Sequence, residues 1–246
     1  MAKAWSFISA VLLTSLAYAG PPFITDDPEP VDYQAWEVNY ALTGSRGGSG
    51  TSAFLPQIDT NYGIASGVQF HVQPQVAYIS QPGSRAYGLG DTELGLKYRL
   101  TPESENADDW MASLYPLVEI PTGNASRNLG AGASSFYLPF WFQTSRNGWT
   151  TYGGGGYWVN NGPNAKNAWA GGWVALYQVT ARLQFGGELF GKTADVPGGH
   201  GSTSFNLGGT YGLVKDYSLL FSAGRGLTNA ADGNAKSVYL ALQVLY

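Results

Sequence analysis

A strict two-residue alternation of apolar and polar side chains runs through residues 68–78, and it constrains the fold more than any other feature of the sequence. The even positions are Val, Phe, Val, Pro, Val and Tyr, and the odd positions are Gln, His, Gln, Gln and Ala. A period of two predicts a β-strand with one apolar and one polar face. The segment also has the length of about 9–11 residues that a tilted strand needs to cross a membrane.

The same alternation returns along most of the chain after residue 32. Further segments that show it are 36–42, 54–59, 91–100, 112–120, 136–142, 153–159, 169–179, 183–189, 205–211, 219–221 and 238–246. In the second of these, Phe54, Pro56 and Ile58 form the apolar set and are expected to face outward. The segments predict about twelve strands, an even number of the kind that bacterial outer-membrane barrels have.

The connections between these segments alternate in length. Short turns are expected near residues 65–67, 146–148, 180–181 and 215–216, and 101–109 is a longer connection on the same side. Longer polar loops are expected near residues 44–50, 81–88, 122–135, 160–167, 193–201 and 228–236. This alternation is typical of short periplasmic turns and longer external loops, and it places both ends of the barrel domain in the periplasm.

The composition separates a membrane barrel from a soluble β-sandwich, which also alternates. Charged residues make up 12% of the 246 residues, too few to cover a water-facing exterior, while aromatic residues reach 14% and glycine numbers 34. The mean hydropathy of −0.12 is too low for a bundle of membrane helices. We therefore predict an all-β fold, a single transmembrane antiparallel β-barrel of about twelve strands.

Aromatic residues fall near the ends of the expected strands, where the aromatic girdles of membrane barrels lie. They are Trp36, Tyr62, Tyr78, Trp110, Trp149, Trp169 and Tyr246. Tyr246 is also in phase with the lipid-facing side chains of the last strand. An aromatic C-terminal residue on such a strand resembles the outer-membrane assembly signal, so the expected partners are outer-membrane lipid and the barrel-assembly machinery.

The N-terminal residues 1–19 have the pattern of a cleavable signal peptide. Lys3 precedes a short apolar stretch, and Ala17-Tyr18-Ala19 forms an A-x-A cleavage site. A retained membrane anchor is the alternative. Export then places the protein in the outer membrane of a Gram-negative bacterium, with a leader at residues 20–32 and the barrel at 33–246.

The leader itself has two readings. It is either a flexible periplasmic segment, which is the simpler expectation, or a plug inside the barrel. Asp26, Asp27 and Glu29 would meet Lys97 or Arg99 in the second case.

Three short motifs resemble a known protein family. The leader sequence PPFITDDPEPV at residues 21–31, followed by Trp36-Glu37, is similar to the family's opening, and residues 90–98 and 116–123 are similar to its internal strands. The family is the one named for the meta pathway of phenol degradation. The resemblance implies an outer-membrane, transporter-like barrel and the uptake of small solutes, aromatic or hydrophobic ones among them. It carries over no catalytic residue.

Charged and ionisable side chains are expected on the polar, lumen-facing side of the strands. They are Asp59, His71, Asp91, Glu93, Lys97, Arg99, Glu119 and Glu188. Four of them share one strand and carry both signs of charge. Such a ladder either forms a polar constriction that selects solutes or only neutralises charge inside a narrow barrel, and the two roles are compatible.

Other chemistries find little support in the sequence. His71, with Asp91 or Glu93 nearby, and His200 are the two histidines available for a hydrolase, but a hydrogen-bonded lumen histidine explains His71 equally well. The four glycines at 153–156 precede no helix and are no phosphate loop. We expect no metal site beyond weak calcium binding at residues 26–27 or 108–109, no cofactor, and, at a net charge of −4, no nucleic-acid partner.

The leading hypothesis for function is therefore an outer-membrane channel or transporter for a small-molecule solute. The alternative is a non-conducting barrel with a structural or sensing role, in which the leader plugs the lumen. A barrel hydrolase is the third hypothesis, and the protein is not expected to be an enzyme.

Overall fold

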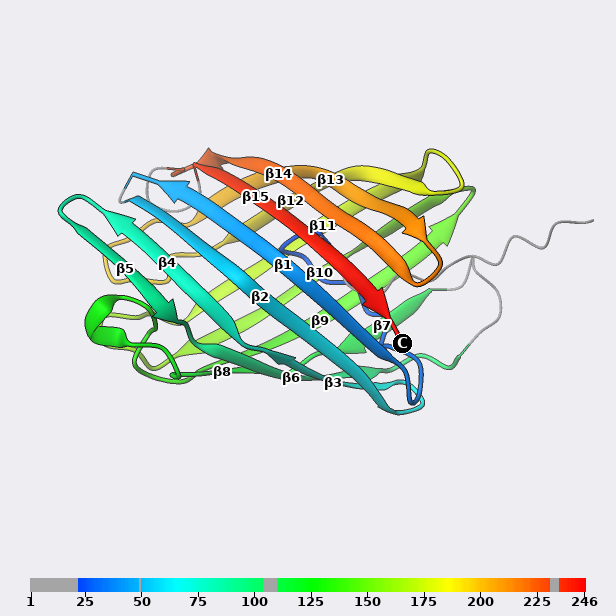
Figure 1. Cartoon of the computed structure of the whole chain (residues 1–246), viewed down its shortest axis with the longest axis horizontal. Helices are drawn as coiled ribbons and strands as arrows, with labels where there is room; N and C mark the ends of the chain where they lie inside the picture. Colours follow the sequence, from blue (N-terminus) through cyan, green and yellow to red (C-terminus); the bar gives the residue numbers. More distant parts are fainter. Residues whose placement is uncertain (1–21, 49, 104–109, 231–234) are drawn as a thin grey trace, which may run out of the picture.

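The chain folds into one antiparallel sheet that closes on itself as a barrel (Figure 1). The computed structural model describes residues 22–48, 50–103, 110–230 and 235–246, so the expected signal peptide at 1–19 and the acidic pair at 108–109 lie outside the described residues. The strands are β1 Trp36–Gly47, β2 Gly50–Ala65, β3 Val68–Gln73, β4 Gln75–Gln81, β5 Ser84–Leu89, β6 Thr92–Arg99, β7 Met111–Leu114, β8 Leu117–Ile120, β9 Ser135–Arg146, β10 Trp149–Asn160, β11 Ala168–Gln178, β12 Leu183–Lys192, β13 Ser202–Val214, β14 Tyr217–Thr228 and β15 Lys236–Leu245.

Three pairs of these segments are single barrel strands with one interruption, which makes twelve strands as predicted. β3 and β4 separate at Pro74, β5 and β6 at Gly90 and Asp91, and β7 and β8 at Tyr115 and Pro116. Proline lacks the backbone N–H that continues the hydrogen-bond ladder, which explains two of the three breaks. On both sides of each break, the two segments pair antiparallel with the same neighbouring barrel strands.

The last strand closes the barrel against the first. β15 pairs with β1 over the register from Glu37 with Leu245 to Arg46 with Lys236. The Trp36 and Tyr246 backbones then exchange hydrogen bonds of 3.1 and 2.9 Å. This closure was predicted, and it removes the unpaired edges that an open sheet would expose.

The four predicted short turns are present, but two of the predicted loops are wrong. β1 continues to Gly47 and β2 begins at Gly50, while β4 continues to Gln81 and β5 begins at Ser84, so tight hairpins replace the loops expected at 44–50 and 81–88. These segments are rich in Ser and Gly, a composition that predicts loops. Strands that extend beyond the membrane meet water on their outer face, so their polar sequence is compatible with strand.

The predicted phase of residues 68–78 is confirmed. Gln69 and His71 are buried inside the barrel, whereas Phe70 and Tyr78 are exposed on the outside. The phase predicted for Phe54 is wrong, because the pairing register of β2 shifts between Phe54 and Gln57. This irregularity turns Phe54 toward the lumen, where it packs against buried alanines, and leaves its neighbour Leu55 outside.

Aromatic pairs line the outside of the barrel near both rims. Trp36 and Tyr62 have ring centroids 4.3 Å apart at the end that carries the C-terminus. Tyr157 and Trp169, 5.0 Å apart, lie at the opposite ends of their strands. These positions are those of the girdles that anchor a barrel at the two membrane surfaces. No helix in the described part of the chain has the length and hydropathy that a membrane-spanning helix needs.

Candidate functional site in the barrel lumen

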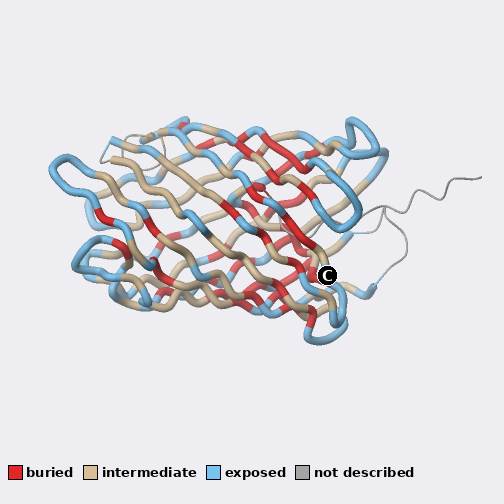
Figure 2. Tube along the Cα trace, viewed as in Figure 1, coloured by how far each residue is buried: buried red, intermediate tan, exposed pale blue. Residues whose placement is uncertain are grey.

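The leader lies inside the barrel over residues 22–31 and leaves it, with Asp32 exposed, at the end that carries the C-terminus. Its hydrogen bonds to the barrel wall are Ser222 Oγ to the Pro22 carbonyl at 2.5 Å, Thr25 N to Glu188 Oε1 at 2.6 Å and Val31 N to Gln69 Oε1 at 2.8 Å. These partners lie on β14, β12 and β3, so the leader crosses the lumen. Buried positions gather toward the same end of the barrel (Figure 2).

Two glycines in the wall leave the space that the leader occupies. A Cβ at Gly172 would lie 2.2 Å from Thr25 Oγ1, and a Cβ at Gly63 would lie 1.9 Å from the carbonyl oxygen of Asp32. Any larger residue at these two positions would collide with the leader. The barrel wall is therefore shaped to receive this segment.

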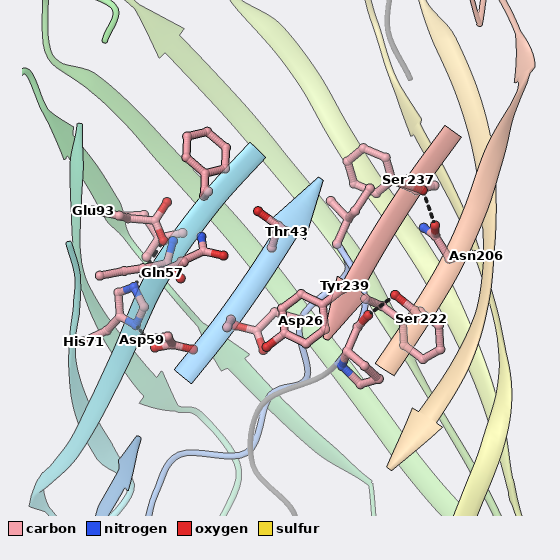
Figure 3. Close-up of a pocket in the computed structure, with 18 of the residues that line it drawn as sticks. Asp26, Thr43, Gln57, Asp59, His71, Glu93, Asn206, Ser222, Ser237 and Tyr239 are labelled. Carbon is pink, nitrogen blue, oxygen red and sulfur yellow. Dashed lines mark hydrogen bonds and ion pairs between the residues drawn. The ribbon is translucent and has the colours of Figure 1, made fainter. Parts of the chain in front are cut away.

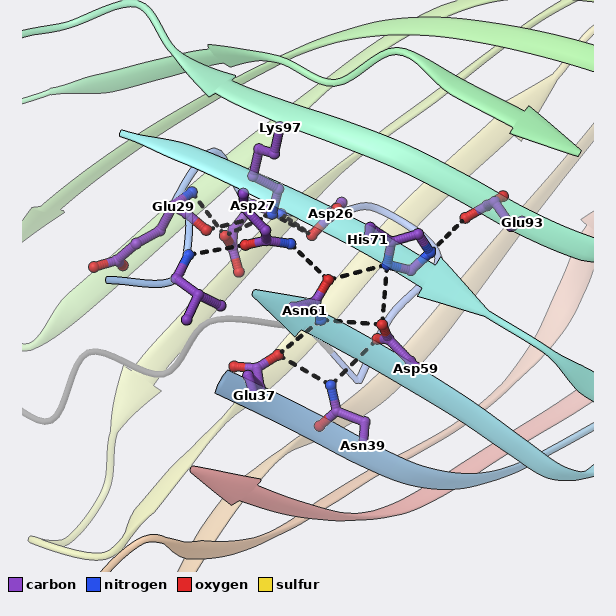
Figure 4. Close-up of polar contacts among 12 residues, drawn as sticks. Asp26, Asp27, Glu29, Glu37, Asn39, Asp59, Asn61, His71, Glu93 and Lys97 are labelled. Carbon is purple, nitrogen blue, oxygen red and sulfur yellow. Dashed lines mark hydrogen bonds and ion pairs between the residues drawn. The ribbon is translucent and has the colours of Figure 1, made fainter. Parts of the chain in front are cut away.

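Lys97 is the centre of the ionic contacts between leader and wall (Figure 4). Its Nζ lies 3.3 Å from Asp26 Oδ1 and 3.5 Å from Asp27 Oδ1, and it donates to the Glu29 carbonyl at 3.4 Å. The Tyr115 ring lies 4.9 Å from the same nitrogen, and the lysine side chain is only 2% exposed. These contacts hold residues 26–29 against the barrel wall.

The two leader carboxyls beside Lys97 have raised pKa values. Burial raises the pKa of Asp26 to about 6 and the pKa of Glu29 to about 7. The charged groups that face them are Lys97 and, for Glu29, Arg99, which lower the pKa, together with Asp27 and, for Glu29, Asp32, which raise it. The loss of hydration thus outweighs the attraction of the lysine.

A second polar cluster lies beside the first, on β2, β3 and β6. His71 Nδ1 lies 3.0 Å from Asp59 Oδ1, and its Nε2 lies 3.2 Å from Glu93 Oε1. Asn61 accepts a hydrogen bond from Gln69 Nε2 at 2.6 Å, while its Oδ1 lies 3.0 Å from His71 Nδ1. Since Gln69 also holds the leader at Val31, one hydrogen-bond network joins the His71 cluster to the leader.

Beside these clusters the lumen contains a cavity of about 480 Å³. Figure 3 shows Asp59, His71 and Glu93 on one side of it and Asn206, Ser222 and Ser237 on the other. Asp26 of the leader and Tyr239 lie between the two groups. The leader therefore forms part of the cavity lining, together with side chains of the wall.

The neighbouring part of the lining is aromatic, and the Tyr115 ring centroid lies 5.9 Å from that of His71. Tyr115, Tyr137 and Trp141 form a buried apolar cluster with Leu117, and Trp158 packs against it. The Tyr137 and Trp158 rings are stacked, with centroids 4.5 Å apart and planes 6° from parallel. The cavity thus joins a charged wall to an apolar wall of flat rings.

The structure brings four of the eight predicted lumen residues to this cavity. Asp59, His71, Glu93 and Lys97 line it. Of the other four, Asp91 accepts hydrogen bonds from the backbone N–H of Gly123 at 2.9 Å and of Ala131 at 2.6 Å. Because Asp91 lies between β5 and β6, it fastens the external loop over residues 121–134 to the wall. Of the two carboxylates considered near His71, it is Glu93 and not Asp91 that lies at the ring.

Two of the remaining three predicted residues, Glu188 and Arg99, form hydrogen bonds with other parts of the chain. Glu188 accepts the Thr25 N–H of the leader, and its Oε2 accepts a hydrogen bond from Asn206 Nδ2 at 2.5 Å. Arg99 donates to the Pro102 carbonyl at 2.9 Å, near the end of its strand. Glu119 is paired in register with Glu93. The described cavity lining includes none of these three side chains.

Sequence reasoning missed Glu37 and the aromatic side of the cavity. Glu37 is the second residue of β1, is fully buried and accepts hydrogen bonds from Asn39 Nδ2 and Asn61 Nδ2 at 3.0 and 3.3 Å. Tyr137 lies between lipid-facing Phe136 and Leu138, so the alternation of β9 already carried the signal for its inward position.

A closed barrel with a girdled outer surface and a solute-sized lumen defines the outer-membrane β-barrel class. Within this class, the chain belongs to the family described as "Putative MetA-pathway of phenol degradation", whose sequence profile matches residues 49–244. None of the curated proteins with which the sequence was compared matches it.

Two solved structures share the fold. One is an outer membrane channel from Pseudomonas putida F1, which is 15% identical, with a TM-score of 0.69 over 89% of this chain and 98% of that one. The other is the NanC porin, which is 9% identical, with a TM-score of 0.57 over 86% of this chain and 98% of the porin.

Proposed function

We propose that the protein is a narrow outer-membrane channel through which small solutes pass beside the leader. The observation that carries this function is the cavity of about 480 Å³ in the lumen, which has polar side chains on one wall and aromatic rings on the other. Its size is that of a small-ligand pocket rather than of a wide aqueous pore. The fold shared with a channel and a porin supports the proposal.

A non-conducting barrel is the second candidate, because the leader is fastened inside the lumen. Its contacts come from two sides of the wall, from Lys97 and Gln69 on the paired strands β6 and β3 and from Glu188 on β12. In that case the cavity would be a closed binding chamber for a structural or sensing role. Conductance separates the two candidates.

We propose transport rather than catalysis for the His71 cluster. The His71 side chain is 5% exposed, and each ring nitrogen lies beside a carboxylate, Asp59 or Glu93. Neither nitrogen is therefore open to a substrate, as a general base would have to be.

Liposome swelling tests the channel function directly. We expect liposomes that contain the purified barrel to swell in a pentose such as arabinose and much more slowly in a trisaccharide such as raffinose, because the lumen cavity admits only small molecules. Liposomes without protein are the control. Failure to swell in any solute, together with no ion current in planar bilayers, would support the closed barrel instead.

The pKa values of Asp26 and Glu29 predict how the current depends on pH. Both values are higher in the docked leader than the ordinary carboxyl values, so the docked leader binds protons more tightly than a released one. Docking is therefore strongest below about pH 4 and weakens as the pH rises through about 6 to 7. We expect the open time in planar bilayers to increase between about pH 5 and about pH 8 by at least about tenfold, the change that Asp26 alone would give.

The double variant Asp26→Asn, Glu29→Gln keeps the leader but removes both titrations, and its open time should be flat over the same range. A wild-type open time that decreases toward pH 8 would contradict this prediction. The Asp195→Asn variant, which breaks an ion pair of 2.6 Å with Lys192 near the external rim, serves as the control and should keep the wild-type response.

A further inference from the structure

We propose that the lumen cavity binds small aromatic cations, with the ammonium group beside Asp59 and Glu93 and the ring against the Tyr137–Trp158 wall. This inference rests on the proposed channel function and names its solute class. The two halves of the cavity supply the two parts of the recognition.

The charged half of the cavity has an excess of carboxylates. Four of its lining residues are acidic and two are basic. The acidic residues are Asp26, Glu37, Asp59 and Glu93, and the basic ones are His71 and Lys97. Even a protonated His71 neutralises only one of the two carboxylates beside it, so this cluster keeps a net negative charge.

Lys97 cannot offset this charge for an incoming anion. Its ammonium group already has Asp26 and Asp27 at 3.3 and 3.5 Å, the Glu29 carbonyl at 3.4 Å and the Tyr115 ring on a further side. An anion would have to displace the leader from this buried group. A carboxylate solute in the accessible part of the cavity is therefore repelled by Asp59 and Glu93, with no cation free to offset them.

The carboxylates of Asp59 and Glu93, by contrast, remain accessible. The side chains of Asp59 and Glu93 are 21% and 25% exposed, whereas that of His71 between them is 5% exposed. Glu37, fully buried at the same wall, has an Oε2 with no hydrogen-bond partner among the described residues. A buried acceptor without a hydrogen bond costs free energy, and a donor group on the solute would form the missing bond.

The aromatic half explains why a ring accompanies the cation. The stacked pair of Tyr137 and Trp158 offers a flat surface, and Trp141 and Tyr115 extend it. Aromatic rings favour other rings in offset or edge contacts, and their faces also attract cations. A molecule with an ammonium group at one end and a ring at the other matches both walls.

Three isosteric probes test the inference: 2-phenylethylammonium, 2-phenylethanol and phenylacetate. They share the ring and differ in charge. Binding to the purified full-length mature protein in detergent is measured by titration calorimetry and by the fluorescence of the cavity tryptophans. We expect the ammonium compound to bind at least about tenfold more tightly than phenylacetate, with the alcohol between them.

The variants Glu93→Gln and Asp59→Asn should each reduce this preference several-fold, and Glu93→Asp should restore most of it. Asp216→Asn is the matched control, because Asp216 lies in a turn at a φ of 63° that asparagine also adopts. Heat-modifiable migration on gels shows whether each variant is folded. Equal or tighter binding of phenylacetate, or a preference that Glu93→Gln and Asp59→Asn both leave unchanged, would overturn the inference.

The calorimetric readout does not depend on conduction. A barrel that prefers the ammonium compound but passes no current would refute the channel and keep the cation site. A barrel that conducts but binds the three probes equally would keep the channel and refute the cation site.

Discussion

Deletion of residues 22–31 is expected to raise the single-channel conductance of the barrel several-fold. The leader crosses the lumen between β12, β14 and β3, and it lines the cavity. Twelve strands lie between the eight that leave a filled interior and the 16–18 that leave a wide aqueous channel. In a barrel of this intermediate width, one chain segment occupies a large share of the cross-section, so its removal has a large effect.

The deletion also leaves Lys97 and Glu188 without their leader partners, which costs stability. A second variant therefore carries Asp27→Asn and leaves every wall residue in place. Because Lys97 then loses the carboxylate that lies 3.5 Å from its Nζ, we expect frequent transitions to the higher conductance in planar bilayers. The control is again Asp195→Asn, which removes the ion pair with Lys192 at the external end of β12. If both leader variants keep the wild-type conductance, the leader does not obstruct the pore.

The sequence predicted the barrel well because the membrane imposes a periodic constraint. Strands such as β13 and β15 have one face in lipid and one in the lumen, so their alternation is visible in the sequence without knowledge of any contact. The prediction failed where that constraint ends. The hairpins at Gly47 and at Gln81 extend beyond the lipid, and the register shift at Phe54 depends on the pairing partner.

The site was predicted less completely, because alternation gives a direction but no depth or partner. It placed Asp91 and His71 on the same face, but Asp91 binds the backbone of an external loop and His71 binds Asp59 and Glu93. Which carboxylate reaches which cation depends on strand stagger, and stagger is a long-range property of the closed sheet. The position of the leader depends on the same long-range contacts.

Replacement of Leu207 by arginine is expected to destabilise the barrel by about 2–4 kcal/mol. Leu207 is the sixth of the thirteen residues of β13, and its side chain is 52% exposed on the outside of the barrel. An arginine at this depth must place its charge in hydrocarbon or distort the bilayer to reach water. Urea titration of the protein folded into phosphatidylcholine vesicles measures the loss.

The matched control lies on the same strand. Val214 is the last residue of β13, beside the periplasmic turn, and is 69% exposed. Its arginine variant keeps the charge near the headgroups, so we expect a cost of only about 0–1 kcal/mol. The difference between the two variants, rather than either value alone, measures the depth of the lipid around β13. Equal costs at Leu207 and Val214 would mean that the outer face of this strand is not embedded as the alternation requires, and a negligible cost at both would mean that it faces water.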